Sequence, residues 1–137
     1  EGSAVASVSD LFTSKDIRSL SQIVNEMKEA ANSNVDTDHL AELDVAFHNL
    51  LLSKGGNEIV RELWFRSCQA IGKLLFYAKW KEMFDPAQIH LRHKKILDAI
   101  KSKNPAVIEK TIRDHYITAG EIISRHTSET YPATDGK

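Results

Sequence analysis

Residues 40–48 read Leu40-Ala41-Glu42-Leu43-Asp44-Val45-Ala46-Phe47-His48. The large apolar side chains of this stretch recur three or four residues apart, which is the spacing of the buried face of an α-helix. Asp44 and His48 lie four residues apart on the same face. Burying a polar group without a partner costs roughly 2–7 kcal/mol. We therefore expect a bound group or a polar partner for these two side chains inside the fold.

The rest of the chain also has helical periodicity, and no alternating strand pattern is present. Start signals of helices occur at Thr13, Asn57, Asp85 and Asn104, and proline follows the last two. An opening helical segment at 1–6 and five further helices are expected, over about 14–31, 37–53, 58–84, 86–102 and 105–126. Short connections favour antiparallel neighbours. The sequence thus predicts an all-α antiparallel bundle of about six helices with a central metal and ligand pocket.

The segment 58–84 is apolar on most sides, which predicts a helix buried in the centre of the bundle. The residues that indicate this are Ile59, Val60, Leu63, Trp64, Ile71, Leu74, Leu75 and Tyr77. Cys68 lies in the same segment and is expected to be plain core packing. Residues 127–137, with Pro132 and Gly136, are expected to form a flexible tail.

Composition limits the classes of function. The chain has 137 residues, enough for one domain, and a formal net charge of −1 without a basic stripe, which argues against nucleic-acid binding by this chain alone. No stretch approaches the roughly 20 apolar residues of a membrane span, and no signal peptide is recognisable. A single cysteine cannot form an internal disulfide, which favours the reducing cytoplasm.

Two more histidines take core positions in apolar ladders. His93 stands between Ile89 and Ile96, and His115 follows Ile112. A lone core histidine is more often hydrogen-bonded to a backbone carbonyl than bound to a metal. Three such histidines and a carboxylate in one small bundle favour a divalent metal held by Asp44, His48, His93 and His115. Imidazole and carboxylate ligands suit zinc, nickel, iron, manganese or cobalt.

The remaining histidines have simpler explanations. His39 and His126 are expected in the first and last turns of their helices, and a cation suits the last turn. His90 precedes His93 by one turn and is expected to be exposed or to lie just outside the site. Four protein ligands on a six-coordinate ion leave two positions open, which suits a bidentate organic carboxylate in an otherwise apolar pocket.

These residues also carry a resemblance to a known family. The motifs are Asp44-x-x-Phe47-His48-x-x-Leu51, Gly56-Asn57, His93-x-x-Ile96-Leu97-x-Ala99-Ile100 and Ile112-x-x-His115, after an opening with Ser14-Lys15-Asp16-Ile17-x-x-Leu20. Their order, with separations of 4, 45 and 22 residues between Asp44, His48, His93 and His115, resembles the C-terminal effector-binding (FCD) domain of FadR-type GntR transcriptional regulators. The match covers nearly the whole chain.

The resemblance implies that residues 1–126 form a metal-dependent effector-binding domain. It also implies a small carboxylate metabolite beside the metal, a homodimer, and control of DNA binding by an N-terminal winged helix-turn-helix that these residues do not include. The chain is then the sensor half of a regulator. Arg66 is a candidate to pair with an effector carboxylate, although a surface or salt-bridged arginine is the commoner case. Asn57 is a second candidate contact, although a helix cap explains it as well.

Two alternatives stay open. The first is a metalloenzyme such as a hydrolase of small substrates, which needs a general base near a metal-bound water. The nearby acids Glu42, Glu62 and Glu109 have no evident place in the pocket, so we do not expect an enzyme. The second is a metal-free helical interaction module whose histidines are only packed and hydrogen-bonded.

Overall fold

The computed structural model describes residues 1–33, 37–55, 57–67 and 83–130. Every element in these ranges is helical, which confirms the predicted all-α class. The elements are α1 (Gly2–Ala6), the 3-10 turn η1 (Ser9–Leu11), α2 (Ser14–Asn32), α3 (Thr37–Leu52), α4 (Glu58–Trp64), α6 (Pro86–Ser102) and α7 (Pro105–Thr130).

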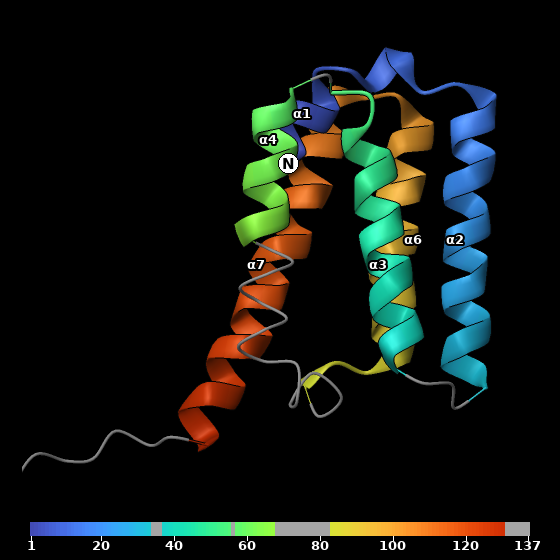
Figure 1. Cartoon of the computed structure of the whole chain (residues 1–137). Coiled ribbons are helices and arrows are strands. Elements are labelled where there is room, and N and C mark those ends of the chain that lie inside the picture. The colour runs from blue at the N-terminus through green and yellow to red at the C-terminus, as the bar shows by residue number, and fades with distance from the viewer. Residues whose placement is uncertain (34–36, 56, 68–82, 131–137) are drawn as a thin grey trace, which may run out of the picture.

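The helices form an antiparallel bundle (Figure 1). Helix α2 packs against α3 and α6, and α6 packs against α7. Each of the pairs α2–α3, α3–α4 and α6–α7 reverses direction, as the short connections predict (Figure 1). The short helix α1 packs against α7 near the end of the bundle where α7 begins.

Helices α2, α4, α6 and α7 begin where the sequence predicts, because each of these starts has a side-chain cap. The Thr13 hydroxyl and the Asp16 carboxylate form a reciprocal capping box at α2. Asn57 accepts hydrogen bonds from the first amides of α4, and Asp85 accepts from Ala87 at the start of α6. Asn104 accepts from Ala106 and Val107 at the start of α7. These caps satisfy amides that have no partner within the helix.

The core consists of the apolar ladders that the periodicity predicts. Side chains from all six α-helices of the described residues are buried together, and the largest of those fully enclosed are Leu20, Met27, Leu40, Phe47, Leu51, Leu52, Ile96, Ile100, Ile108 and Ile112. Two histidines, His48 and His93, share this interior, each with only 2% of its surface exposed. The polar side chains therefore lie in the same interior as the apolar ladders, as expected from the sequence.

Two expectations need correction. Helix α7 continues to Thr130, so residues 127–130 are helical and not part of a tail, and residues 131–137 lie outside the described ranges. Helix α4 is not buried on most sides: Ile59 is 70% exposed and Leu63 is 59% exposed. This helix lies at the edge of the bundle beside α7 and buries mainly Trp64 (Figure 1). The predicted continuation to residue 84, with Cys68, Ile71, Leu74, Leu75 and Tyr77, falls mostly outside the described residues.

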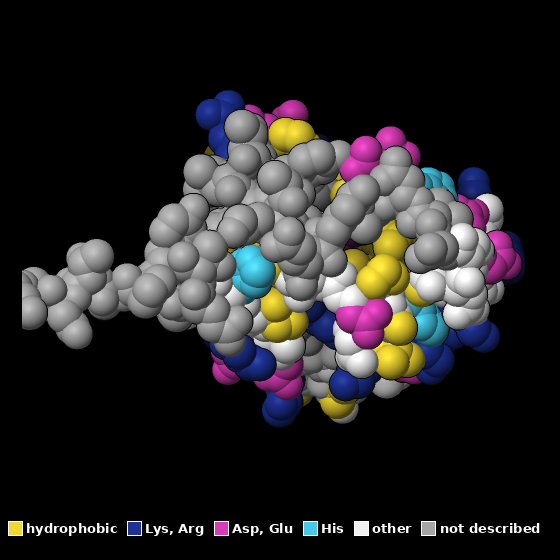
Figure 2. All heavy atoms as spheres, turned by 90° about the horizontal axis from the view of Figure 1, so that it is seen from below, with side chains coloured by type: hydrophobic (Ala, Val, Ile, Leu, Met, Phe, Trp, Pro, Cys, Tyr) yellow, Lys and Arg dark blue, Asp and Glu magenta, His cyan; other side chains and the backbone are white. Residues whose placement is uncertain are grey.

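The described surface carries mixed charges. On the face shown in Figure 2, Lys and Arg side chains alternate with Asp and Glu, and no basic patch gathers among the described residues. Among the described residues, no helix combines the length and the apolar character that crossing a membrane requires.

Asp16 connects the start of α2 to the end of α3. Its Oδ2 accepts hydrogen bonds from the Thr13 amide (2.8 Å) and hydroxyl (2.6 Å) and pairs with Lys54 Nζ at 2.9 Å. The Thr13 hydrogen bond and, next, the Lys54 contact lower the pKa of Asp16 from 3.8 to about 2. A carboxyl group whose pKa is lower in the folded state stabilises the fold above its unfolded pKa. This contribution is lost as the pH falls from 3.8 towards about 2.

We predict that Asp16→Asn lowers the free energy of unfolding by about 1 kcal/mol at neutral pH, because it weakens the cap and removes the partner of Lys54. The difference from the wild type should shrink below pH 3.8 and disappear only as the pH falls through and below about 2. Urea denaturation across this pH range measures it, with Asp10→Asn in the exposed part of η1 as the control. A difference that stays constant down to pH 2 would contradict the assignment.

Candidate metal centre

Three histidines from three helices meet in the interior. His48 comes from α3, His93 from α6 and His115 from α7, and their ring centroids lie 5.0–5.4 Å apart. One ring nitrogen from each lies within 4.8 Å of one from each of the others. The convergence that the ladders predict is therefore present.

The carboxylate of Asp44 faces the same point. Its Oδ1 lies 3.0 Å from His93 Nε2 and 3.8 Å from His48 Nε2. Asp44 reaches this place because it stands one turn before His48 on α3. We refer to Asp44, His48, His93 and His115 as the Asp–His cluster.

The position of the proton on the His93 ring determines which of its nitrogens can bind a cation in the cluster. Its Nδ1 lies 2.8 Å from the carbonyl oxygen of Ile89, and a carbonyl only accepts, so this nitrogen carries the proton. In a neutral ring Nε2 is then a bare lone pair. It is buried, lies 3.0 Å from Asp44 Oδ1, and makes no hydrogen bond among the described residues. Two electron-rich atoms this close repel each other unless a second ring proton or a metal ion lies between them.

His48 is held from its outer side by Glu1. The Nδ1 of His48 donates to Glu1 Oε1 at 2.6 Å, so its Nε2 is the atom turned towards Asp44. The Tyr116 hydroxyl donates to the other oxygen of Glu1 and accepts from Trp64 Nε1 at 2.5 Å. An outer carboxylate of this kind fixes the tautomer and the orientation of a metal-binding imidazole.

Glu1 and Tyr116 are members of the site that the sequence analysis missed. Tyr116 follows Ile112 by four residues, so its helical spacing was a usable signal. Glu1 stands before a helix of only five residues, which is too short for a periodic pattern to show which way the side chain points.

His115 stays neutral at physiological pH. Burial, followed by the neighbouring His93, His48 and Arg92, lowers its pKa to about 2, against a smaller opposing effect of Asp44. Its Nδ1 is buried and has no hydrogen-bond partner among the described residues. A neutral imidazole is the form that binds metals.

The cluster fits a divalent metal ion. Two ligands at right angles on an ion with bonds of about 2.1 Å lie about 3 Å apart, and the Asp44–His93 contact measures 3.0 Å. Buried nitrogens of His93 and His115 have no hydrogen-bond partner among the described residues, which leaves their lone pairs available to a metal. Three imidazole nitrogens and one carboxylate oxygen form a donor set that zinc, nickel and similar metals accept.

The other predicted contacts lie elsewhere. Arg66 pairs with Glu62 at 2.7 Å, and its side chain is 74% exposed. Asn57 caps α4 with its side-chain oxygen. His39 is exposed, and its Nδ1 lies 3.8 Å from Glu42 Oε2. His90 is partly buried, and this burial lowers its pKa. Roles of Arg66 and Asn57 in effector binding remain predictions that this geometry does not support.

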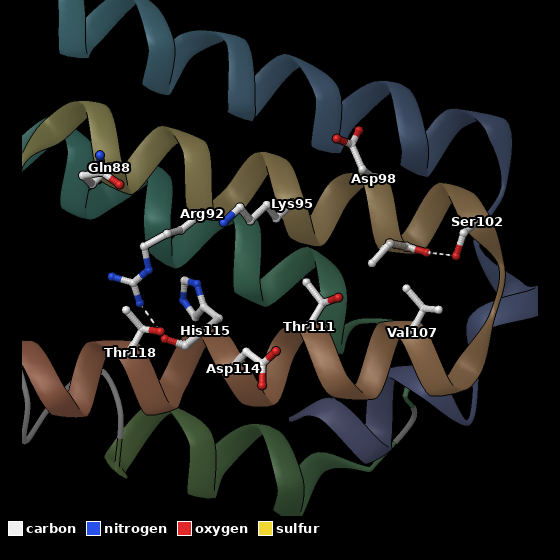
Figure 3. Close-up of a pocket in the computed structure, with 11 residues that line it drawn as sticks. Gln88, Arg92, Lys95, Asp98, Ser102, Val107, Thr111, Asp114, His115 and Thr118 are labelled. Atoms are coloured by element: carbon white, nitrogen blue, oxygen red, sulfur yellow. Dashed lines mark hydrogen bonds between the residues drawn. The ribbon is translucent and has the colours of Figure 1, made fainter.

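A cavity of about 590 Å³ lies between α6 and α7 and borders the cluster through His115 (Figure 3). Arg92 lines the same cavity, and its Nη2 donates to the carbonyl oxygen of His115 at 2.5 Å. Burial lowers the pKa of the Arg92 guanidinium and Asp44 partly offsets this effect, but the group stays charged. Arg92 is a further residue that the sequence analysis missed, because an arginine beside a core histidine normally faces solvent.

We predict that Tyr116→Phe lowers the free energy of unfolding by about 1–3 kcal/mol, because it leaves Trp64 Nε1 without its acceptor and Oε2 of Glu1 without its Tyr116 donor in a buried place. Chemical denaturation measures the change. Ser53→Ala, which removes an exposed hydroxyl bonded only within its own turn, should change stability by less than about 0.5 kcal/mol. Equal stabilities of the Tyr116 variant and the wild type would contradict the hydrogen-bond chain.

Comparisons with known proteins identify the family of the chain. Residues 1–118 match the FCD domain family. The chain is 31% identical over 108 residues to "Putative transcriptional regulatory protein NedR" of Micromonospora viridifaciens, an alignment that covers 77% of this chain and 74% of that protein. No solved structure matches the chain. The chain therefore belongs to the FCD domain family, the effector-binding domain of GntR-type transcriptional regulators that its motifs indicate.

Proposed function

We propose that this domain senses a small organic carboxylate through a divalent metal held by Asp44, His48, His93 and His115. Binding of the effector controls the affinity for DNA of a winged helix-turn-helix domain linked to it. The observation that carries the proposal is the buried Nε2 of His93, which has no hydrogen-bond partner among the described residues and faces Asp44 Oδ1 at 3.0 Å beside the nitrogens of His48 and His115. The name of the NedR relative, a transcriptional regulatory protein, supports the regulatory part.

Each residue of the cluster has a separate task. Asp44 supplies the negative charge that offsets part of the charge of a divalent ion. The hydrogen bonds to Ile89 and Glu1 hold the rings of His93 and His48 with one nitrogen facing inward. Phe47 packs edge-on against both rings, at centroid distances of 5.0 and 5.7 Å, and keeps the wall apolar. The metal, when bound, supplies a positive docking point for a carboxylate.

The cluster joins three helices, which makes it suited to signalling. Asp44 and His48 belong to α3, His93 to α6 and His115 to α7, so an effector at the metal contacts groups whose relative positions define the bundle. A ligand shifts a conformational equilibrium only by its difference in affinity for the two states, typically about 1–3 kcal/mol. We further propose a homodimer in the cytoplasm, since paired half-sites on DNA are read by paired domains.

The acids considered as general bases favour a sensor over an enzyme. Glu62 pairs with Arg66, and Glu109 accepts from Ser3 and Arg113. Glu1, the buried carboxylate nearest the histidines, is bonded to both His48 and Tyr116. Each of these carboxylates is already used by a neighbour, and a general base needs a free lone pair near the reacting water.

We predict that the His93→Ala/His115→Ala double variant loses the stoichiometric metal of the wild type, because two of the four ligands are gone. Elemental analysis of the purified proteins measures this, and His39→Ala/His90→Ala is the control that removes two histidines outside the cluster. Chelator should lower the melting temperature of the wild type and of the control, but not of the double variant. A double variant that keeps its metal would show that the ligands are wrong. A metal-free wild type indifferent to chelator would favour the interaction module.

Asp44→Asn gives a second test, because its effect on the melting temperature should be opposite in the absence and in the presence of the metal. In chelator the new amide can donate to His93 Nε2, which removes the repulsion and should raise the melting temperature. With metal present the variant loses a charged ligand, so its melting temperature should fall below that of the wild type. A lower melting temperature under both conditions would mean that a proton on His93, and not a metal, fills this place.

A further inference from the structure

The cavity between α6 and α7 is far larger than the docking of a single carboxylate requires. It has a volume of about 590 Å³ and runs from Arg92 and His115 at one end to Ser102 and Val107 at the other (Figure 3). His115 belongs to both the cavity wall and the Asp–His cluster, so the cavity lies directly beside the proposed metal. A molecule that reaches the metal from this side occupies the cavity as well.

The unpaired charge in the cavity is positive. Its two acids are engaged within their own helices, since Asp98 pairs with Lys94 at 2.6 Å and Asp114 with Lys110 at 2.5 Å. Lys95 lines the cavity and has no ion-pair partner among the described residues. Two cationic side chains therefore remain for a ligand, those of Lys95 and Arg92.

Arg92 is a partly buried cation that has N–H donors not used in hydrogen bonds among the described residues. Its Nη2 is bonded to the His115 carbonyl, but its Nε is enclosed and has no hydrogen-bond partner among the described residues. Arg92 and Lys95 are three residues apart on α6, which places them on one face with Cβ atoms about 5–6 Å apart. Both side chains line the cavity, where Arg92 extends from α6 towards α7 and Lys95 lies along α6 (Figure 3).

We propose that the effector is a dianion, a short dicarboxylate, whose second carboxylate is bound by Arg92 and Lys95. The inference rests on the proposed function, which puts the first carboxylate at the metal. The guanidinium supplies directed hydrogen bonds and the ammonium a further charge, which together suit a carboxylate. The apolar side chains of Ala99 and Val107 line the cavity beyond these two residues.

The test compares succinate with butyrate, which has the same number of carbons and one carboxylate fewer. Calorimetric titration of the metal-loaded protein should show succinate binding at least roughly 10-fold more tightly. Arg92→Gln and Lys95→Gln should each weaken succinate binding roughly 10- to 100-fold and leave butyrate binding nearly unchanged. Lys101→Gln, which removes an equal charge from the same helix outside the cavity, should change neither.

Metal content, measured on the same samples, separates the two proposals. Stoichiometric metal with equal affinities for succinate and butyrate, or with affinities that neither substitution changes, overturns the dicarboxylate inference alone. Wild-type protein without metal that still binds succinate through Arg92 and Lys95 overturns the metal proposal alone. Absence of both metal and succinate binding overturns both. Because Lys95 is exposed, Lys95→Gln remains informative if circular dichroism shows that Arg92→Gln does not fold.

Discussion

The structure depends on one contact, between the Nε2 of His93 and the Oδ1 of Asp44. The two atoms lie 3.0 Å apart in the interior, and the proton of the ring is held on the opposite nitrogen by the Ile89 carbonyl. Such a contact is unfavourable for a neutral ring and an ionised carboxylate, but favourable when both bind one cation. It joins α3 to α6, two long helices that both pack on α2, so packing of the apolar ladders also determines the position of the ligands.

The surroundings of this contact limit the freedom of each ligand. His48 is fixed by Glu1, which is itself fixed by Tyr116, whose hydroxyl is bonded to Trp64. This chain of hydrogen bonds connects Glu1 with side chains of α3, α4 and α7. A buried polar network of this kind stabilises the fold only when every member has its partner. The cluster therefore has one well-defined arrangement, which is what binding a metal requires.

The sequence predicted those parts of the site that lie on regular ladders. His93 and His115 replace apolar residues in helical repeats, and Asp44 and His48 share one face of α3, so their convergence followed from periodicity alone. Glu1 and Arg92 could not be found in this way. The first precedes a very short helix, and the second reaches the cavity only because its long side chain bends towards α7. The apolar residues of α4 were misplaced because periodicity does not tell whether a helix stands at the centre or the edge of a bundle.

Helix α7 connects the site to the start of the chain. It carries His115 at the cluster and packs against α1 near its own start. The contact with α1 is close: a Cβ added to Gly2 would lie 3.0 Å from the carbonyl oxygen of Glu109, and the Ser3 hydroxyl donates to the Glu109 carboxylate at 2.9 Å. A close-packed contact transmits a displacement from one helix to the next, because it contains no free space into which the displaced atoms could move. Under the proposed function, an effector between α6 and α7 that shifts α7 must also shift α1, so the first residues move with the sensor.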